Sequence, residues 1–216
     1  KPVGGGQLAV SLYGIHSTMT LWNNFTHYLD DPVNGDQEQQ DENRSTAGGG
    51  AAYSLHHSFG SIQSDTMIGF QGRYDSVFVD RRHTLRRQTL DYCMLEQADG
   101  PALPYAAVNG YCNADRVHLL DLAPYAQNML RWTSWLRTVV GFREEFYHAT
   151  DFSRTTSAGG RGHQWLAEPK ASIILGPWER TELYFSYGRG FHSDDVRGVF
   201  GTVPGQGVPL AAGATP

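Results

Sequence analysis

The chain has no long hydrophobic run and little charge. Its 216 residues contain no stretch of about 18 consecutive apolar residues, which excludes a membrane-spanning helix. Only 18% of the residues are charged, compared with ~25% in a typical soluble chain. The net charge of -5 argues against a nucleic-acid partner, because phosphate binding needs a clustered Lys/Arg surface.

Motifs that carry catalysis are also missing. There is no nucleophile elbow, phosphate-binding loop or zincin motif, so we predict that the chain is not an enzyme. Histidines are common metal ligands, and the adjacent pair His56 and His57 is the first candidate for a metal site. Adjacent residues of a strand point to opposite faces, so this pair cannot bind one ion without distortion. We therefore expect no metal site and no cofactor.

Cysteine is scarce. The two cysteines, Cys93 and Cys112, flank a segment that is rich in Pro, Gly, Ala and Asn. In an exported protein a disulfide between them is plausible, and two unpaired buried thiols are the alternative. Their spacing matches no zinc or haem motif.

What the sequence does contain is long stretches of alternating apolar and polar residues. The segment from Leu136 to about Tyr147 keeps this alternation, whereas the average globular strand has ~5 to 6 residues. Its apolar set is Leu136, Thr138, Val140, Phe142 and Phe146, and its opposite set includes Arg137, Arg143 and Glu145. Such a pattern is typical of a tilted strand that faces lipid on one side and a wet lumen on the other.

Three further segments show the same alternation of apolar and polar residues. Their apolar sets are Thr66, Ile68, Phe70 and Tyr74; Trp165, Ala167, Pro169, Ala171, Ile173 and Leu175; and Thr181, Leu183, Phe185 and Tyr187. The segment from Leu8 to Leu29 has apolar residues on both faces, and we expect a β-bulge there.

The alternation predicts seven long strands in an up-and-down order. They are Gln7–Leu29, Ser45–Phe59, Asp65–Val79, Val117–Trp132, Leu136–Phe152, His163–Leu175 and Thr181–His192. Short connections (Gly60–Ser64, Thr133–Trp135, Gly176–Arg180) alternate with longer ones (Asp30–Arg44, Asp80–Arg116, Ser153–Gly162). Short periplasmic turns and long extracellular loops are a property of outer-membrane barrels. Trp132, Trp135 and Trp178 fall at or beside the short turns, as an aromatic girdle would.

Two long connections carry charge. The basic segment contains Arg81, Arg82, Arg86 and Arg87. It is either a solvated loop or strand end, or a contact to anionic lipopolysaccharide or ligand. The acidic loop contains Asp30, Asp31, Asp36, Glu38, Asp41 and Glu42. It is either a solvated surface loop or a contact for a ligand or divalent cation, and its spacing does not fit an EF-hand.

Three stretches resemble a known family. They are APYAQNMLRWTSWLRTVVGFR (Ala123–Arg143), EPKASIILGPW (Glu168–Trp178) followed by GRGFHSDD (Gly188–Asp195), and FTHYLDDPVNGD (Phe25–Asp36). In these stretches, and over nearly its whole length, the chain resembles the barrel domain of TonB-dependent outer-membrane receptors.

The resemblance implies an all-β fold, an antiparallel up-and-down transmembrane β-barrel of 22 strands that is plugged by an N-terminal domain. Such receptors sit in the outer membrane of Gram-negative bacteria, amid lipid and lipopolysaccharide. They import a scarce solute, most often an iron-siderophore complex, with energy from the TonB complex. We expect residues 1–216 to be an internal fragment of that barrel domain, with about seven strands and with the plug domain absent. A passive porin-like channel and a secreted β-rich binding module are the alternatives.

Ligand contacts are expected in the extracellular loops and the upper lumen, because loops on a rigid scaffold carry most recognition. The candidates are Tyr105 and Tyr111 between the cysteines, and Arg161, His163, His192, Asp194, Asp195 and Arg197 beyond the strand ends. An aromatic ring next to an arginine suits a planar anionic chelate.

Overall fold

The protein forms one antiparallel β-sheet. The computed structural model describes residues 2–29, 31–89, 113–153 and 159–191. The strands are β1 (Pro2–Val3), β2 (Gly6–Asn23), β3 (Glu38–Phe59), β4 (Ile62–Leu85), β5 (Gln88–Thr89), β6 (Asn113–Arg131), β7 (Leu136–Ser153), β8 (Gly159–Trp178) and β9 (Thr181–Gly188). Within the described ranges, no helix is long and apolar enough to cross a membrane.

The strands follow one another in space as they do in the chain. The order across the sheet is β1-β2-β3-β4-β6-β7-β8-β9, with β5 folded back on the end of β4. All pairings are antiparallel. The expected up-and-down order of seven main strands is thereby confirmed, with β1 and β5 as two-residue additions.

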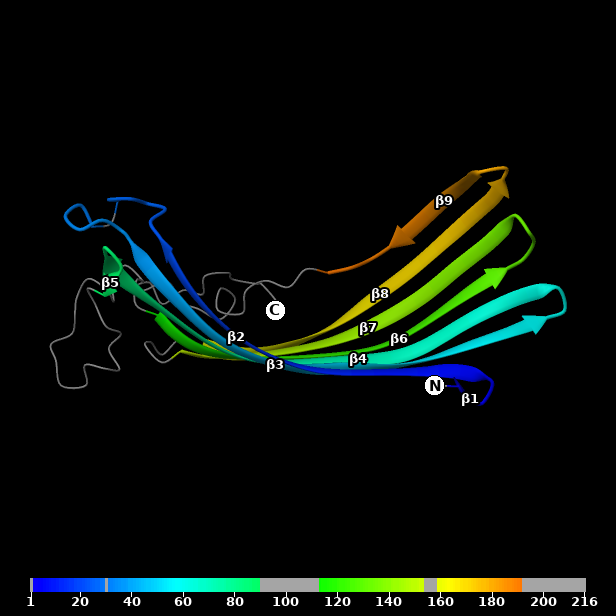
Figure 1. Ribbon diagram of the computed structural model, residues 1–216, viewed down its shortest axis with the longest axis horizontal. Helices are drawn as coiled ribbons and strands as arrows, with labels where there is room; N and C mark the ends of the chain where they lie inside the picture. Colours follow the sequence, from blue (N-terminus) through cyan, green and yellow to red (C-terminus); the bar gives the residue numbers. More distant parts are fainter. Residues whose placement is uncertain (1, 30, 90–112, 154–158, 192–216) are drawn as a thin grey trace.

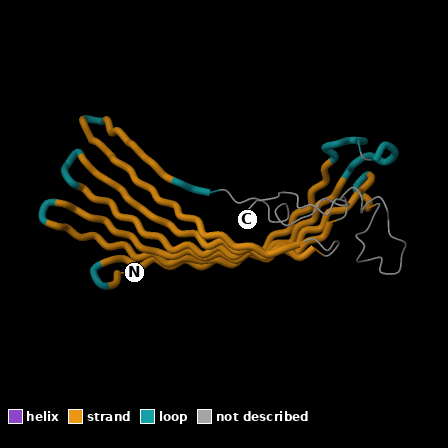
Figure 2. The backbone as a smooth tube through the Cα atoms, turned by 180° about the vertical axis from the view of Figure 1, so that it is seen from behind, coloured by secondary structure: helices purple, strands orange, loops and turns teal. Residues whose placement is uncertain are grey.

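The sheet is bent into a long trough (Figures 1 and 2). The tight turns β3–β4, β6–β7 and β8–β9 lie at one end of the trough, and the loop of residues 24–37 lies with β5 at the other. Gly60 has a φ of 61° in the β3–β4 turn, a conformation that glycine adopts without steric cost. Short turns and longer connections therefore alternate as expected.

The register divides the side chains between two faces. Val140 lies opposite Ala171, and Phe142 opposite Pro169, on what we call the apolar face. Its large exposed side chains include Leu12, Ile68, Phe70, Val140, Phe142, Trp165, Ile173 and Phe185. The polar face carries Arg73, Asp75, Asp121, Arg143, Glu145, Glu168 and Lys170. The predicted apolar sets all fall on the apolar face, which confirms the two-residue period.

A small core lies on the polar face, toward the end of the trough that carries the loop of residues 24–37. Val77 and Val79 on β4, Val117 on β6, and Tyr147 and Ala149 on β7 form this buried cluster. Val77 and Val79 share a face because alternate residues of a strand do, and Val77 lies directly opposite Val117 on the next strand. The core therefore holds the three central strands β4, β6 and β7 together near this end of the sheet.

Several predicted boundaries were wrong. No bulge interrupts β2, which pairs with β3 without a shift from Gln7 to Asn23, whereas the pairing of β8 with β9 shifts its register between Leu175 and Trp178. β3 begins at Glu38 rather than Ser45, and β4 continues to Leu85 rather than Val79. Cross-strand hydrogen bonding carries these strands through residues whose polar composition had suggested loops.

Candidate functional site

The polar face carries a ladder of paired charges across the middle of the sheet. Arg73 on β4 donates to Asp75 through Nε at 2.7 Å and through a terminal nitrogen at 3.0 Å. Asp75 also accepts a hydrogen bond of 2.5 Å from the Thr46 hydroxyl and lies 3.6 Å from Arg44. The Asp75 side chain is only 5% exposed, so these partners compensate a carboxylate that the sheet removes from water.

A second group of charges continues the ladder on β7 and β8. Arg143 donates to Glu145 at 2.5 and 3.0 Å and to the Gln71 side-chain oxygen at 2.7 Å. Its Nε lies 3.9 Å from Glu168. The Asp121 Oδ1 atom beside this group is buried and has no hydrogen-bond partner within the described part of the chain. The charged side chains of β4, β7 and β8 thus form one connected group on the polar face.

A hollow of about 370 Å³ lies beside Arg143. Its lining includes Gln71, Tyr125, Gln127, Glu168, Lys170 and Arg189. Gly141 gives room for the Lys170 side chain, since a Cβ at that position would meet the Lys170 Cε at 2.6 Å. Together with Arg143, which also lines it, the hollow has three cations and one carboxylate and suits an anionic group.

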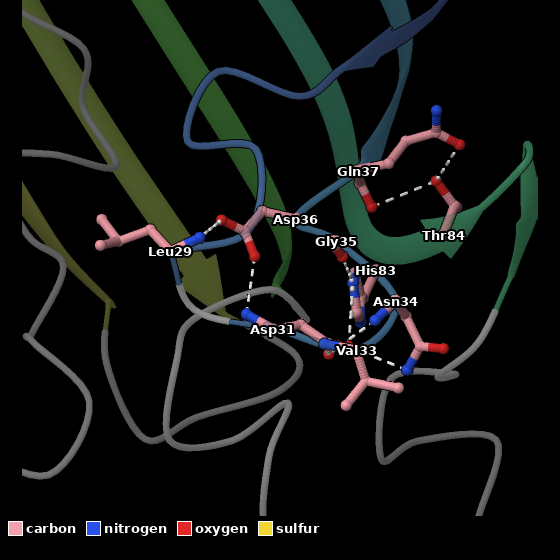
Figure 3. Close-up of polar contacts among 9 residues, drawn as sticks. All are labelled: Leu29, Asp31, Val33, Asn34, Gly35, Asp36, Gln37, His83 and Thr84. Carbon is pink, nitrogen blue, oxygen red and sulfur yellow. Dashed lines mark hydrogen bonds and ion pairs between the residues drawn. The ribbon is translucent and has the colours of Figure 1, made fainter.

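The loop of residues 24–37 is folded around two carboxylates (Figure 3). Asp36, 2% exposed, accepts the backbone N–H groups of Leu29 at 2.8 Å and Asp31 at 2.7 Å. Asp31 in turn accepts the N–H groups of Val33 at 3.0 Å and Asn34 at 2.9 Å. The hydrogen bond from the Asn34 N–H is the main cause that lowers the pKa of Asp31.

The same loop is fastened to the end of β4. The buried His83 donates from Nε2 to the Gly35 carbonyl at 2.6 Å and lies 3.8 Å from the Asp31 carboxylate. The Thr84 backbone N–H donates to the Gln37 carbonyl at 2.7 Å. The loop therefore has a defined shape, and it displays exposed apolar side chains, namely Phe25, Tyr28, Leu29 and Val33.

The acidic and basic segments neutralise each other. Arg82 on β4 pairs with Asp80 and lies 3.3 Å from Asp41 on β3. Arg81 lies 3.3 Å from Glu38. Among the described residues, no group of three His, Cys, Asp or Glu side chains could hold a metal ion. The paired strands β3 and β4 contain Glu38, Asp41, Glu42, Arg81 and Arg82, whereas Asp31, Asp36, Arg86 and Arg87 lie in the connections. Arg81 and Arg82 thus lie at the end of a strand, which was one of the expectations for the basic segment.

The structure places two of the predicted ligand contacts. Arg161 and His163 were expected beyond a strand end or in the upper lumen, but both lie in β8 on the apolar face, in line with Trp165. The other candidates, Tyr105, Tyr111, His192, Asp194, Asp195 and Arg197, lie outside the described residues, as do Cys93 and Cys112. Their contacts with a ligand and the disulfide stay predictions.

Sequence reasoning missed the anchoring role of His83. Its partner Gly35 is 48 positions away in the chain, and a single histidine within a basic segment carries no local signal of such a contact. The turn itself could have been recognised, because an Asp followed by Pro, Asn and Gly favours a tight turn closed by the carboxylate.

The fold is that of a known transporter barrel. The chain is similar to the structure described as "Crystal structure of ferric citrate transporter FecA in the unliganded form", with a TM-score of 0.65 and 13% sequence identity. The match covers 85% of this chain and 24% of that chain, so this chain spans about a quarter of its length. No protein-family model and no curated protein matches the sequence. The likeness shows that the sheet is a section of such a β-barrel.

Proposed function

We propose that this chain is part of the wall of an outer-membrane receptor that imports a scarce solute, an iron chelate, with energy from the inner membrane. The observation that carries the proposal is the sheet itself. Its long up-and-down strands bear one apolar and one charged face, and they follow the barrel of a ferric citrate transporter over 85% of the chain. A barrel wall in a bilayer needs this division between lipid and lumen.

The charges of the polar face support an anionic cargo. The hollow beside Arg143 also presents Lys170 and Arg189. Neither Lys170 nor Arg189 has a side-chain hydrogen bond or ion pair within the described ranges, so both cations are available to a polar group that enters the lumen. Metal chelates of citrate type are anionic, and guanidinium groups bind carboxylates well.

Uptake by the full-length protein tests the proposal. The protein is expressed in the outer membrane of a Gram-negative host that lacks its own ferric citrate uptake, and entry of radiolabelled ferric citrate is measured. A receptor gives saturable uptake that is lost when the inner-membrane proton gradient is dissipated. Uptake that rises in proportion to concentration and ignores the gradient would instead identify a passive channel.

Ferric citrate need not be the cargo of this receptor. The same assay is therefore run with ferric complexes of catecholate and hydroxamate chelators. An empty-vector strain is the control for background entry. Gradient-dependent uptake of one complex identifies the cargo class, and no gradient-dependent uptake of any of them contradicts an iron receptor.

A further inference from the structure

Two arginines on the apolar face lack a carboxylate partner. Arg116 on β6 and Arg161 on β8 are exposed, and neither forms an ion pair within the described part of the chain. Elsewhere the arginines of the long strands are paired. Ion pairs are formed by Arg44, Arg73, Arg81, Arg82, Arg131, Arg137 and Arg143. The two exceptions therefore present positive charge for an anion from outside the chain.

Three histidines surround these arginines. His148 on β7 lies opposite His163 on β8, and Thr150 is flanked by His118 and Arg161 in the same row across the sheet. We call Arg116, His118, His148, Arg161 and His163 the cationic patch. Phe146 divides the apolar face of β6, β7 and β8 into a part toward the short turns and a part toward the long loops. In the part toward the long loops, the described residues of these three strands include no Asp or Glu on this face. The nearest carboxylate of these three strands on this face, Glu144, lies on the other side of Phe146. On the neighbouring strand β4, Asp80 shares this face two positions beyond Phe78, the residue opposite Arg116, and forms an ion pair with Arg82.

Aromatic rings mark the boundary between the cationic patch and the apolar part of the face. Phe146 lies 4.7 Å from Trp165 and 6.2 Å from His163 between ring centroids. The Tyr74 hydroxyl and the His118 Nδ1 are 2.8 Å apart. Tyrosine and tryptophan are enriched where a barrel wall passes from hydrocarbon to headgroups. The cationic patch thus begins directly beyond these aromatic rings, and it also includes the exposed Phe152 ring opposite Arg116.

The length of the apolar part agrees with this position. From Trp165 to Leu175 the strand extends roughly 33 Å at about 3.3 Å per residue. A strand tilted by about 40° rises ~25 Å over that length, which is the height of the apolar band of outer-membrane barrels. The cationic patch then lies at the level of the lipid headgroups, on the side of the long loops.

We propose that the cationic patch binds phosphate groups of lipid headgroups in the outer leaflet. The proposal rests on the placement of the sheet as a barrel wall in the outer membrane. Guanidinium groups bind phosphate through two parallel hydrogen bonds, and histidine rings add N–H donors. Arg161 lies two strands away from Arg116 across the sheet and two residues further along the strand direction. The distance between them is therefore ~12 Å. That spacing suits two phosphate groups. Arg161 and His163 then contact lipid instead of cargo.

Lipid binding by the purified full-length barrel tests this assignment. The protein in neutral detergent is titrated with dioleoyl phosphatidic acid, and bound lipid is counted by native mass spectrometry. Dioleoyl phosphatidylcholine and inorganic phosphate are the comparison ligands. A cation near an anionic lipid surface changes affinity about fivefold. R116Q and R161Q should therefore each weaken phosphatidic acid binding about fivefold, and the double variant roughly 30-fold.

A matched variant controls for general loss of charge. Arg180 is an exposed arginine in the β8–β9 turn at the opposite end of the trough, without an ion pair among the described residues. R180Q should leave binding unchanged. The double lysine variant R116K/R161K keeps the charges and should retain binding within a few-fold, and heat-modifiable electrophoretic mobility reports assembly of each variant.

Three results would overturn the cationic patch as a lipid site. The first is equal binding of phosphatidic acid and phosphatidylcholine, and the second is an equal loss in R180Q. The third is full displacement of the lipid by inorganic phosphate, which would identify a site for a soluble anion. The assay contains no cargo and no energy source. Failed uptake with retained lipid binding would therefore contradict the receptor and leave this inference standing.

Discussion

At the scale of single residues, the loop of residues 24–37 depends on the buried Asp36. Its carboxylate accepts two backbone N–H groups, whereas an asparagine would turn its own NH₂ toward one of these donors. We expect Asp36→Asn to favour opening of the loop by ~1 to 3 kcal/mol, the cost of a buried donor left unsatisfied. The rate of proteolytic nicking within residues 24–37 of the full-length protein measures the effect.

Val33→Ser is the matched control, because the Val33 side chain is 84% exposed and lies in the same loop. It should be nicked no faster than the wild type. Equal nicking of Asp36→Asn and the wild type would show that the Asp36 hydrogen bonds do not hold the loop.

Acid should loosen the same loop through Asp31. The Asn34 backbone N–H is the main cause that lowers the pKa of this carboxyl. A carboxyl whose pKa is lowered by folding stabilises the folded loop above its unfolded pKa, and this contribution is lost as the pH falls through the lowered folded pKa. Pepsin nicking should rise as the pH falls from about 4 to 2. Asp31→Asn should be nicked faster at pH 4 and show a smaller rise, and an identical pH profile would contradict this role.

Residue-level contacts were only partly predictable. The tight turn from Asp31 to Gly35 has a local signature, and the alternation assigned Arg143 and Glu145 correctly to one face. The pairing of Arg82 with Asp41 and the anchor from His83 to Gly35 join positions more than 40 residues apart. Such contacts depend on the register of neighbouring strands, which a single sequence does not specify.

At the scale of the strand, two neighbouring valines of β7 provide a matched pair. Val140 lies on the apolar face and is 51% exposed, and Val139 lies opposite Ser172 on the polar face. Val140→Arg should destabilise the assembled barrel by ~2 to 4 kcal/mol, the cost of an arginine in the middle of the lipid-facing band. Val139→Arg should cost much less, because its side chain enters the wet lumen.

Urea titration of the full-length barrel in lipid bilayers measures both free energies of unfolding. Phe142→Arg, on the same face as Val140, should behave like Val140→Arg. Equal costs for Val139→Arg and Val140→Arg would contradict the assignment of the two faces. Arg143 is unsuitable as the control, because its removal would leave Glu145, with a side chain that is 5% exposed, without its main partner.

Strand identity was more predictable than strand ends. Alternation is strong where one face meets lipid, and it gave correct faces for β4, β7, β8 and β9. Beyond that band both faces are polar, so the period disappears from the sequence. Residues Glu38 to Arg44 and Asp80 to Leu85 therefore resembled loops, although they belong to β3 and β4, and Glu38 to Asp41 pair with Asp80 to His83.

At the scale of the whole molecule, the described sheet has open edges. β9 pairs with β8 only between Lys170 and Trp178, and β1 covers only the first residues of β2. Unpaired strand edges invite association with other strands. Residues 1–216 expressed alone should therefore form detergent-resistant aggregates and no discrete monomer. Sedimentation measures this, with the full-length protein as the control, and a stable monomer of residues 1–216 would contradict open edges.

The overall architecture was predictable at low sequence identity because it depends on a pattern rather than on particular residues. A barrel wall forms with any apolar side chain on the apolar face and with any small or polar side chain on the polar face. The same freedom explains why 13% identity accompanies a TM-score of 0.65. Cargo recognition depends on individual loop and lumen side chains, which this pattern does not constrain.

The most direct test of the account is a spin-label scan of β8 in lipid bilayers. Each residue from Trp165 to Leu175 of the full-length protein, with its native cysteines replaced, is labelled in turn, and collisions with oxygen and with a water-soluble nickel complex are measured. If β8 spans the membrane, oxygen access is high at Ala167, Ala171 and Ile173, and nickel access is high at Glu168, Lys170 and Ser172. Access to both reagents without a two-residue period would show that β8 is not part of a membrane-spanning wall.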